Sequence, residues 1–103
     1  MKRRHADIEE ESEAIAGLAE SMVRLRTPAQ TQAVLEDLCT PAELEAMTDR
    51  WRVVPLLLEG VPYREIHDQT LVSVTTIGRV ARTLERGAGG YALAIRHRPS
   101  RGR

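Results

Sequence analysis

The sequence has no phenylalanine, one tryptophan, two tyrosines and one cysteine among 103 residues. With so few aromatic side chains, a core must be built from Leu, Val, Ile, Ala and Met, and this composition favours helices packed on helices. Cys39 has no second cysteine with which to form a disulfide, and His5, His67 and His97 lie far apart in a chain without a CxxC motif. We therefore expect neither a disulfide scaffold nor a metal site.

Long apolar runs are also missing. The longest, residues 53–58, has six residues, whereas a helix that crosses a bilayer needs about twenty. The basic residues at 2–4 are followed by acidic residues and not by the apolar stretch of an export signal. We expect a cytoplasmic protein that makes no contact with a membrane, and the length predicts one helical domain over residues 1–95.

The formal net charge of zero hides an uneven distribution. Residues 1–50 carry 6 basic and 11 acidic side chains, and residues 51–103 carry 9 basic and 4 acidic ones. From Arg79 onward, seven arginines accompany a single acid, Glu85. Such a region attracts phosphate groups even when the whole chain is neutral. Residues 96–103 are predicted to be a basic flexible tail, whose charge is equally well explained by solvation.

A heptad pattern marks the N-terminal part of the chain, which we predict to be an amphipathic helix over residues 8–26. Its apolar positions follow the spacing 7, 3, 4, 3, and acidic residues lie between them. Such a narrow stripe favours packing against a second copy of the chain, and a core helix within one chain is the alternative. The candidate dimerisation residues are Ile8, Ile15, Leu18, Met22 and Leu25.

Two core helices are expected over residues 28–60. Thr27 and Pro28 are typical of a helix start, with Gln30 completing a capping box, so we predict a helix over 28–38. A second helix begins at Pro41 and stops at Gly60. Its apolar face is predicted to comprise Leu44, Met47, Trp51, Val54 and Leu58. Because Pro55 removes the hydrogen bond to the Trp51 carbonyl, we expect a kink or a local break near 51–55.

Residues 62–86 have the proportions of a helix-turn-helix. We predict a short helix from Pro62 through Asp68, a turn at 70–72, a cap at Ser73 and a second helix over 74–84. The second helix buries one face, comprising Ile77, Val80, Ala81 and Leu84. Glycines at 87–90 end it, and residues 91–95 form a last short helix.

The second of these helices suits the major groove of DNA, which admits small polar and methyl-bearing side chains at the leading end of a helix. Val74, Thr75 and Thr76 meet this requirement, and Ser73 with the helix N-terminus can face a phosphate. Two packed helices with a solvated, arginine-rich face would explain the same spacing. Three features depart from a typical unit: Leu71 in the turn where glycine is usual, His67 where a small residue is usual, and Gly78 within the second helix.

Two stretches resemble the Trp repressor family, and together they cover about residues 30–95. Residues 38–60, which start Leu-Cys-Thr-Pro and contain the pair Arg50 and Arg52, look like the central helix of that family. Residues 63–91, with Thr-Ile-Gly-Arg at 76–79 and Gly-Gly-Tyr at 89–91, are similar to its YerC/YecD-type branch. The resemblance implies an all-α, multi-helix Trp-repressor-like fold with a helix-turn-helix, assembled as an intertwined homodimer.

The resemblance also implies site residues. Base-facing positions fall on residues 74, 75, 76 and 78, with flanking contacts from residues 64 and 67. Together with the residues singled out above, the candidate DNA-binding set is Arg64, His67, Ser73, Val74, Thr75, Thr76, Gly78, Arg79 and Arg82.

A small-molecule effector is a separate question. In the Trp repressor two arginines clamp L-tryptophan, and the matching positions with their hydroxyl neighbours are Thr40, Arg50, Thr76, Arg79 and Thr83. We expect no such cofactor, because Val80 stands where the family has a glycine beside the indole ring. Interhelical or dimer-interface salt bridges from Arg50 and Arg79, with Asp49 or Glu45 as partners, are the preferred interpretation.

These observations predict a transcriptional regulator, most simply a repressor, that binds duplex DNA as a homodimer. The alternative is a helical protein-interaction module that has lost DNA reading. No catalytic residue is assigned and we expect no enzyme, because the sequence shows no Ser/His/Asp or Cys/His set, no phosphate loop and no paired carboxylates.

Overall fold

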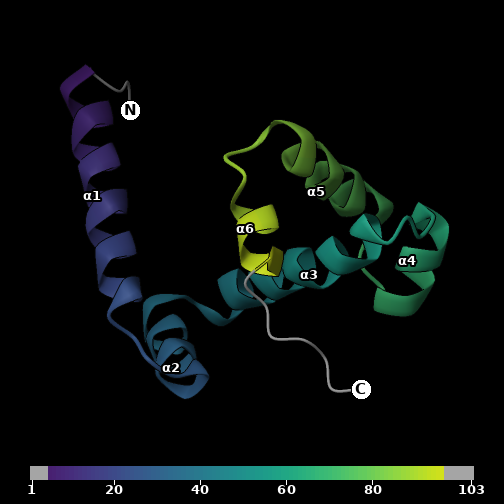
Figure 1. Ribbon diagram of the computed structural model, residues 1–103, viewed down its shortest axis with the longest axis horizontal. Coiled ribbons are helices and arrows are strands. Elements are labelled where there is room, and N and C mark those ends of the chain that lie inside the picture. The colour runs from purple at the N-terminus through teal and green to yellow at the C-terminus, as the bar shows by residue number, and fades with distance from the viewer. Residues whose placement is uncertain (1–4, 97–103) are drawn as a thin grey trace. The chain divides into compact units, whose positions relative to one another are not determined.

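The computed structural model describes residues 5–96 and contains six α-helices and no strand in that range (Figure 1). The predicted all-α class is therefore confirmed. Two compact units, divided between Thr40 and Pro41, make up the chain. No helix in the described range is both long and apolar enough to pass through a bilayer. The predicted basic tail begins at Arg96, and its other residues, 97–103, lie outside the described range.

The N-terminal unit holds α1 (His5–Val23) and α2 (Pro28–Leu38). The first of these ends three residues before the predicted limit at 26, so Leu25 lies beyond the helix. Pro28 explains the difference, because a proline disfavours the helical conformation in the residue before it. Thr27 is accordingly extended, with φ −133° and ψ 155°. The chain turns instead, with the Leu25 N–H donating to the Met22 carbonyl at 3.1 Å.

The start of α2 is as predicted. The Thr27 side chain accepts a hydrogen bond from the Gln30 N–H at 3.1 Å, and Pro28 occupies the first helical position. The Gln30 side chain reaches back to the Arg26 N–H at 2.7 Å, one residue earlier than in the usual capping box. The predicted helix over 28–38 is confirmed. These local hydrogen bonds determine where it begins.

The apolar stripe of α1 is largely open. Ile8, Ile15 and Leu18 are 55%, 64% and 45% exposed, while Met22 and Leu25 are half-buried. Full burial of a side chain of this size stabilises a protein by about 1.5–3 kcal/mol. Within its own unit, the described part of the chain leaves most of this stripe uncovered.

The C-terminal unit contains α3 (Pro41–Leu58), α4 (Tyr63–Thr70), α5 (Val74–Arg86) and α6 (Gly90–Arg96). Helices α3, α4 and α5 pack on one another in all three pairings. Trp51 of α3 and Tyr91 of α6 are in ring contact, with centroids 6.4 Å apart. One core lies among the helices and consists of Val53, Val54, Ile66, Val72, Ile77 and Val80.

Of the kink or local break expected near 51–55, the break does not occur, since α3 is a continuous helix from Pro41 to Leu58. A proline in a helix interior costs about 3 kcal/mol. Val53 and Val54 are completely buried, and burying two valines stabilises the packed helix by about 3 kcal/mol or more. Tertiary packing therefore offsets the penalty that the local sequence imposes.

The predicted apolar face of α3 is only partly correct. Val54 is fully buried, but Met47 and Trp51 are each 38% exposed and Leu58 is 52% exposed. Val53, which the prediction omitted, is fully buried. The reason is that α4 and α5 contribute Ile66, Ile77 and Val80 to a core that closes around the 53–54 turn of α3, so two adjacent residues point into it.

Gly60 ends α3 as predicted, in the left-handed conformation with φ 81°. The Gly60 N–H donates to the Leu57 carbonyl at 3.0 Å and the Val61 N–H to the Leu56 carbonyl at 3.1 Å. These two bonds form a Schellman motif. Val61 and Leu56 both pack against the core, so the motif determines how the chain enters the helix-turn-helix.

Candidate nucleic-acid interface

Helices α4 and α5 form the predicted helix-turn-helix, joined by residues 71–73. The first helix runs two residues further than predicted, through Thr70, and Pro62 precedes it instead of forming its first residue. The inward face of α5 is confirmed, because Ile77 and Val80 are buried and Ala81 and Leu84 are half-buried. The opposite face is therefore free to meet a partner.

His67 and Thr70 hold the turn in place. The Val72 carbonyl accepts a hydrogen bond at 2.7 Å from Nδ1 of His67, which must carry the proton in this contact. The Thr70 hydroxyl donates to the Ile66 carbonyl at 2.7 Å and accepts from the Val72 N–H at 3.1 Å. His67 was predicted to flank the DNA, yet its half-buried ring makes a contact inside the protein that orients α5 relative to α4.

Leu71 adopts the left-handed conformation, with φ 65° and ψ 8°. A non-glycine residue in this region carries a cost of roughly 1–2 kcal/mol. The cost is not offset by burial, since the Leu71 side chain is 82% exposed. The backbone is nevertheless held there, because the Leu71 N–H donates to the His67 carbonyl at 2.8 Å. A leucine in this turn either avoids positive φ or carries strain, and the structure shows the strained conformation.

Ser73 caps α5 as predicted. Its side chain accepts from the Thr76 N–H at 3.1 Å and donates to the Thr76 hydroxyl at 3.0 Å. Thr76 is half-buried, whereas Val74 is 51% exposed and Thr75 is exposed. Three of the four predicted base-facing residues thus differ: Val74 and Thr75 present methyl and hydroxyl groups outward, while the Thr76 hydroxyl is already engaged with the cap.

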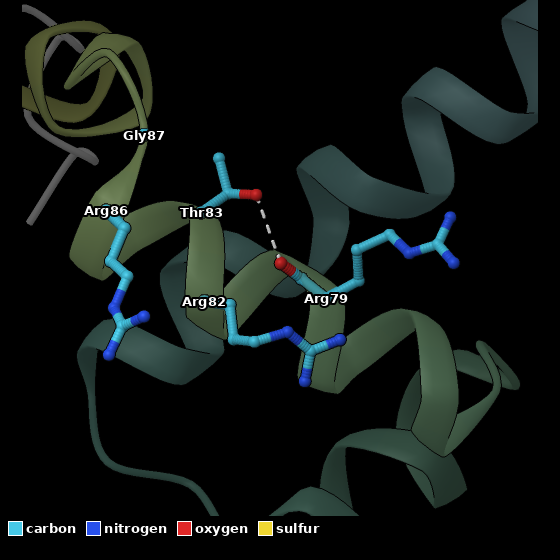
Figure 2. A pocket seen from close by; sticks show the side chains of 5 residues that line it. All are labelled: Arg79, Arg82, Thr83, Arg86 and Gly87. Carbon is cyan, nitrogen blue, oxygen red and sulfur yellow. Dashed lines mark hydrogen bonds between the residues drawn. The ribbon is translucent and has the colours of Figure 1, made fainter.

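The rest of the outward face of α5 is cationic. Arginines rise from successive turns of the helix, and the Arg79 and Arg86 guanidinium groups extend in different directions (Figure 2). Within residues 5–96 no ion pair is formed by Arg79, Arg82 or Arg86, or by Arg64, which is exposed on α4. The three arginines of α5 border a shallow pocket of about 220 Å³, which Thr83 and Gly87 also line.

Gly87 shapes this end of α5. A Cβ atom at that position would lie 2.6 Å from the Thr83 carbonyl oxygen and 2.8 Å from Thr83 Cγ2. The Gly87 N–H donates to the same carbonyl at 2.8 Å. Only glycine permits the chain to leave the helix this close to Thr83, whose hydroxyl in turn donates to the Arg79 carbonyl at 3.1 Å.

The candidate effector residues are gathered only in part. Arg79 and Thr83 line the shallow pocket, while Arg50, Thr76 and Val80 do not, and Thr40 belongs to the N-terminal unit. Val80 is 1% exposed and forms part of the core. The interhelical form of the preferred salt bridges is absent within one chain over residues 5–96: Asp49 pairs with Arg52 at 3.0 Å, and neither Arg50 nor Arg79 has an ion pair there. The dimer-interface form stays a prediction.

Tyr63 was not among the candidate residues, yet it lies beside them. It is the first residue of α4, is 43% exposed and has its ring beside Gly78 of α5. The sequence signal available for it was its place directly after Pro62, at the start of the helix that precedes α5. Only the packing of α4 on α5 brings it next to a residue fifteen positions later.

Comparisons with known proteins agree with this architecture. The family model described as Trp repressor protein matches residues 13–98, a span that includes α2 to α6 and most of α1. The uncharacterized protein YerC of Bacillus subtilis (strain 168) is 33% identical over 78 residues, which cover 76% of this chain and 75% of that protein. This chain is a member of the Trp repressor family, of the YerC type.

Proposed function

We propose that this protein is a transcriptional regulator, most simply a repressor, that binds duplex DNA in a sequence-specific manner as a homodimer. Membership of the Trp repressor family supports a helical DNA-binding regulator. The observation that carries the proposal is the division of α5 into three parts: a buried apolar face, an outward leading end with Val74 and Thr75, and an outward remainder with arginines that lack carboxylate partners within residues 5–96.

Each part has a distinct role on DNA. Val74 and Thr75 offer methyl groups to thymine and a hydroxyl to base edges in the major groove. Arg64, Arg79 and Arg82 contact phosphates and position the reading helix, which contributes affinity without sequence information. Ser73 caps α5, and the free N–H groups at the N-terminus of α5 favour a nearby phosphate.

The homodimer is supported by the exposed stripe of Ile8, Ile15 and Leu18 on α1. A second copy of the same helix supplies a complementary apolar face at the heptad spacing. A two-fold dimer would present two reading helices to half-sites about one DNA turn apart, roughly 34 Å. The DNA sites that bind best should therefore be inverted repeats.

Selection from a library of random duplexes, followed by fluorescence-anisotropy titration at about 50 and 200 mM salt, tests the proposal. We expect inverted-repeat sites that bind more tightly than random duplex. Thr75→Val and Val74→Ala should each reduce discrimination by about 1–3 kcal/mol per altered contact, with little change in binding to random DNA.

Thr48→Val is the matched control, because Thr48 is an exposed helical threonine in α3 whose hydroxyl donates to the Glu45 carbonyl. It should leave both affinities unchanged. Equal losses on selected and random DNA from Thr75→Val would contradict base reading by α5. No binding to any duplex at low salt would contradict the regulator and favour the protein-interaction module.

A further inference from the structure

Nothing in the described part of the protein requires position 78 to be a glycine. It lies inside α5, and a Cβ atom there would be 3.7 Å from Arg82 Nη1 and 3.9 Å from Tyr63 Cε2, which are ordinary van der Waals distances. Glycine is the least favourable residue in a helix interior after proline. Alanine would therefore fit and would stabilise α5.

The neighbours of this bare position are two hydrogen-bond donors from different helices. Arg82 comes from α5 and Tyr63 from the start of α4, and both are exposed. Neither the Arg82 guanidinium nor the Tyr63 hydroxyl has a hydrogen-bond or ion-pair partner within residues 5–96. The bare backbone of Gly78 thus lies beside one cationic and one phenolic side chain, and we call this cluster of three residues the Gly78 notch.

We propose that the Gly78 notch receives one phosphate of the DNA backbone in each half-site. Arg82 donates charge-assisted hydrogen bonds to the phosphate, and the Tyr63 hydroxyl donates another. Gly78 permits the sugar–phosphate chain to approach α5 more closely than any side chain would allow. This inference rests on the proposed function and adds to it a named contact that includes Tyr63.

The position of the notch favours a backbone phosphate over a free anion. Gly78 is four residues from Val74, a separation of about 6 Å along the helix axis. A phosphate held there lies directly beside the bases that Val74 and Thr75 meet. Contacts of this kind fix the register of a reading helix on the duplex, so the notch would position α5 without selecting a sequence.

Gly78→Ala is the decisive variant, because stability and binding should change in opposite directions. Its melting temperature should rise by about 4–8 °C, as expected for a helix-interior glycine replaced by alanine in a domain of this size. Its dissociation constants for selected and random duplex should both increase about tenfold or more, the loss expected when a hydrogen bond to a charged group is broken.

Gly17→Ala is the matched control. Gly17 lies inside α1 with no atom within 4 Å of an added Cβ, and it is off the apolar stripe. The same substitution should raise stability there without altering DNA affinity. If Gly78→Ala and Gly17→Ala bind DNA equally well, the notch does not hold a phosphate.

Two further variants separate the contributions of Arg82 and Tyr63 to binding. Arg82→Gln should reduce the slope of log K against log salt by about 0.9 for each phosphate that the protein no longer neutralises. Tyr63→Phe should weaken binding several-fold with an unchanged slope, because it removes a neutral donor. Arg96→Gln, which removes an arginine at the end of α6, controls for the loss of charge alone.

The outcomes distinguish this inference from the function beneath it. Wild-type binding that weakens with salt, together with unchanged binding by Gly78→Ala and Tyr63→Phe, overturns the notch and leaves the regulator intact. Absence of wild-type binding overturns both. Titration with inorganic phosphate, monitored by the melting temperature, tests the other source of phosphate. Millimolar phosphate that stabilises the wild type but not Gly78→Ala would assign the notch to a free anion. That result would contradict the DNA contact.

Discussion

Replacing Leu71 with glycine should stabilise this protein, because it removes backbone strain at the turn of the helix-turn-helix. Leu71 has φ 65°, where an L-residue with a Cβ atom is disfavoured by about 1–2 kcal/mol. Glycine adopts this conformation without that penalty but loses more chain entropy on folding, by about 0.5–1 kcal/mol. The side chain is 82% exposed, so its removal sacrifices little burial.

The net gain expected is about 0.5–1 kcal/mol, which corresponds to a rise in melting temperature of roughly 2–8 °C. Chemical denaturation followed by circular dichroism, at one fixed protein concentration, measures it. The concentration must be fixed because association would itself raise the apparent stability.

Two companion variants make the test specific. Leu71→Ala removes the side chain but keeps Cβ, so it should not bring the gain, whereas Leu71→Asn should recover part of it because asparagine tolerates this region. If Leu71→Gly is no more stable than Leu71→Ala, the strain argument is wrong. A turn that moved away from φ 65° in solution would produce that result.

Two other substitutions test the contacts on either side of α5. His67→Ala should destabilise the protein by about 1 kcal/mol, because the Val72 carbonyl loses its 2.7 Å partner. His67→Asn should restore much of this stability by supplying an N–H near the Nδ1 position. Equal stability of the two variants in urea titrations would contradict the role given to the ring. Gly87→Ala should destabilise by about 1–3 kcal/mol because its Cβ would lie 2.6 Å from the Thr83 carbonyl oxygen; a melting temperature equal to that of the wild type would show that this end of α5 relaxes freely.

Local chemistry was enough to predict several elements from the sequence. The bounds of α2, the stop of α3 at Gly60 and the cap of α5 at Ser73 all depend on hydrogen bonds between residues at most five apart. The inward face of α5 followed from helical spacing alone, since Ile77 and Val80 recur on one side of any helix at these positions. Such features need no knowledge of what packs against them.

The prediction failed where the answer depends on a distant part of the chain. Pro55 alone indicates a kink or a local break, but α3 is not broken, because burial of Val53 and Val54 against α4 and α5 offsets the cost of the proline. Helical spacing selected Met47 and Trp51 as core residues, yet the core closes around the adjacent pair at 53 and 54. Periodicity says which residues share a face, and only the packing partners say which part of the face is covered.

The same limit applies to the candidate interface. The sequence by itself determined that α5 carries small polar residues at its start and arginines beyond, because these are properties of one helix. Three features went unpredicted although they depend on contacts within five residues: His67 holds the turn, Thr76 serves the cap and Leu71 is strained. The tertiary structure alone brought Tyr63 beside Gly78 and Arg82, since residues on two helices become neighbours only when the core between those helices forms.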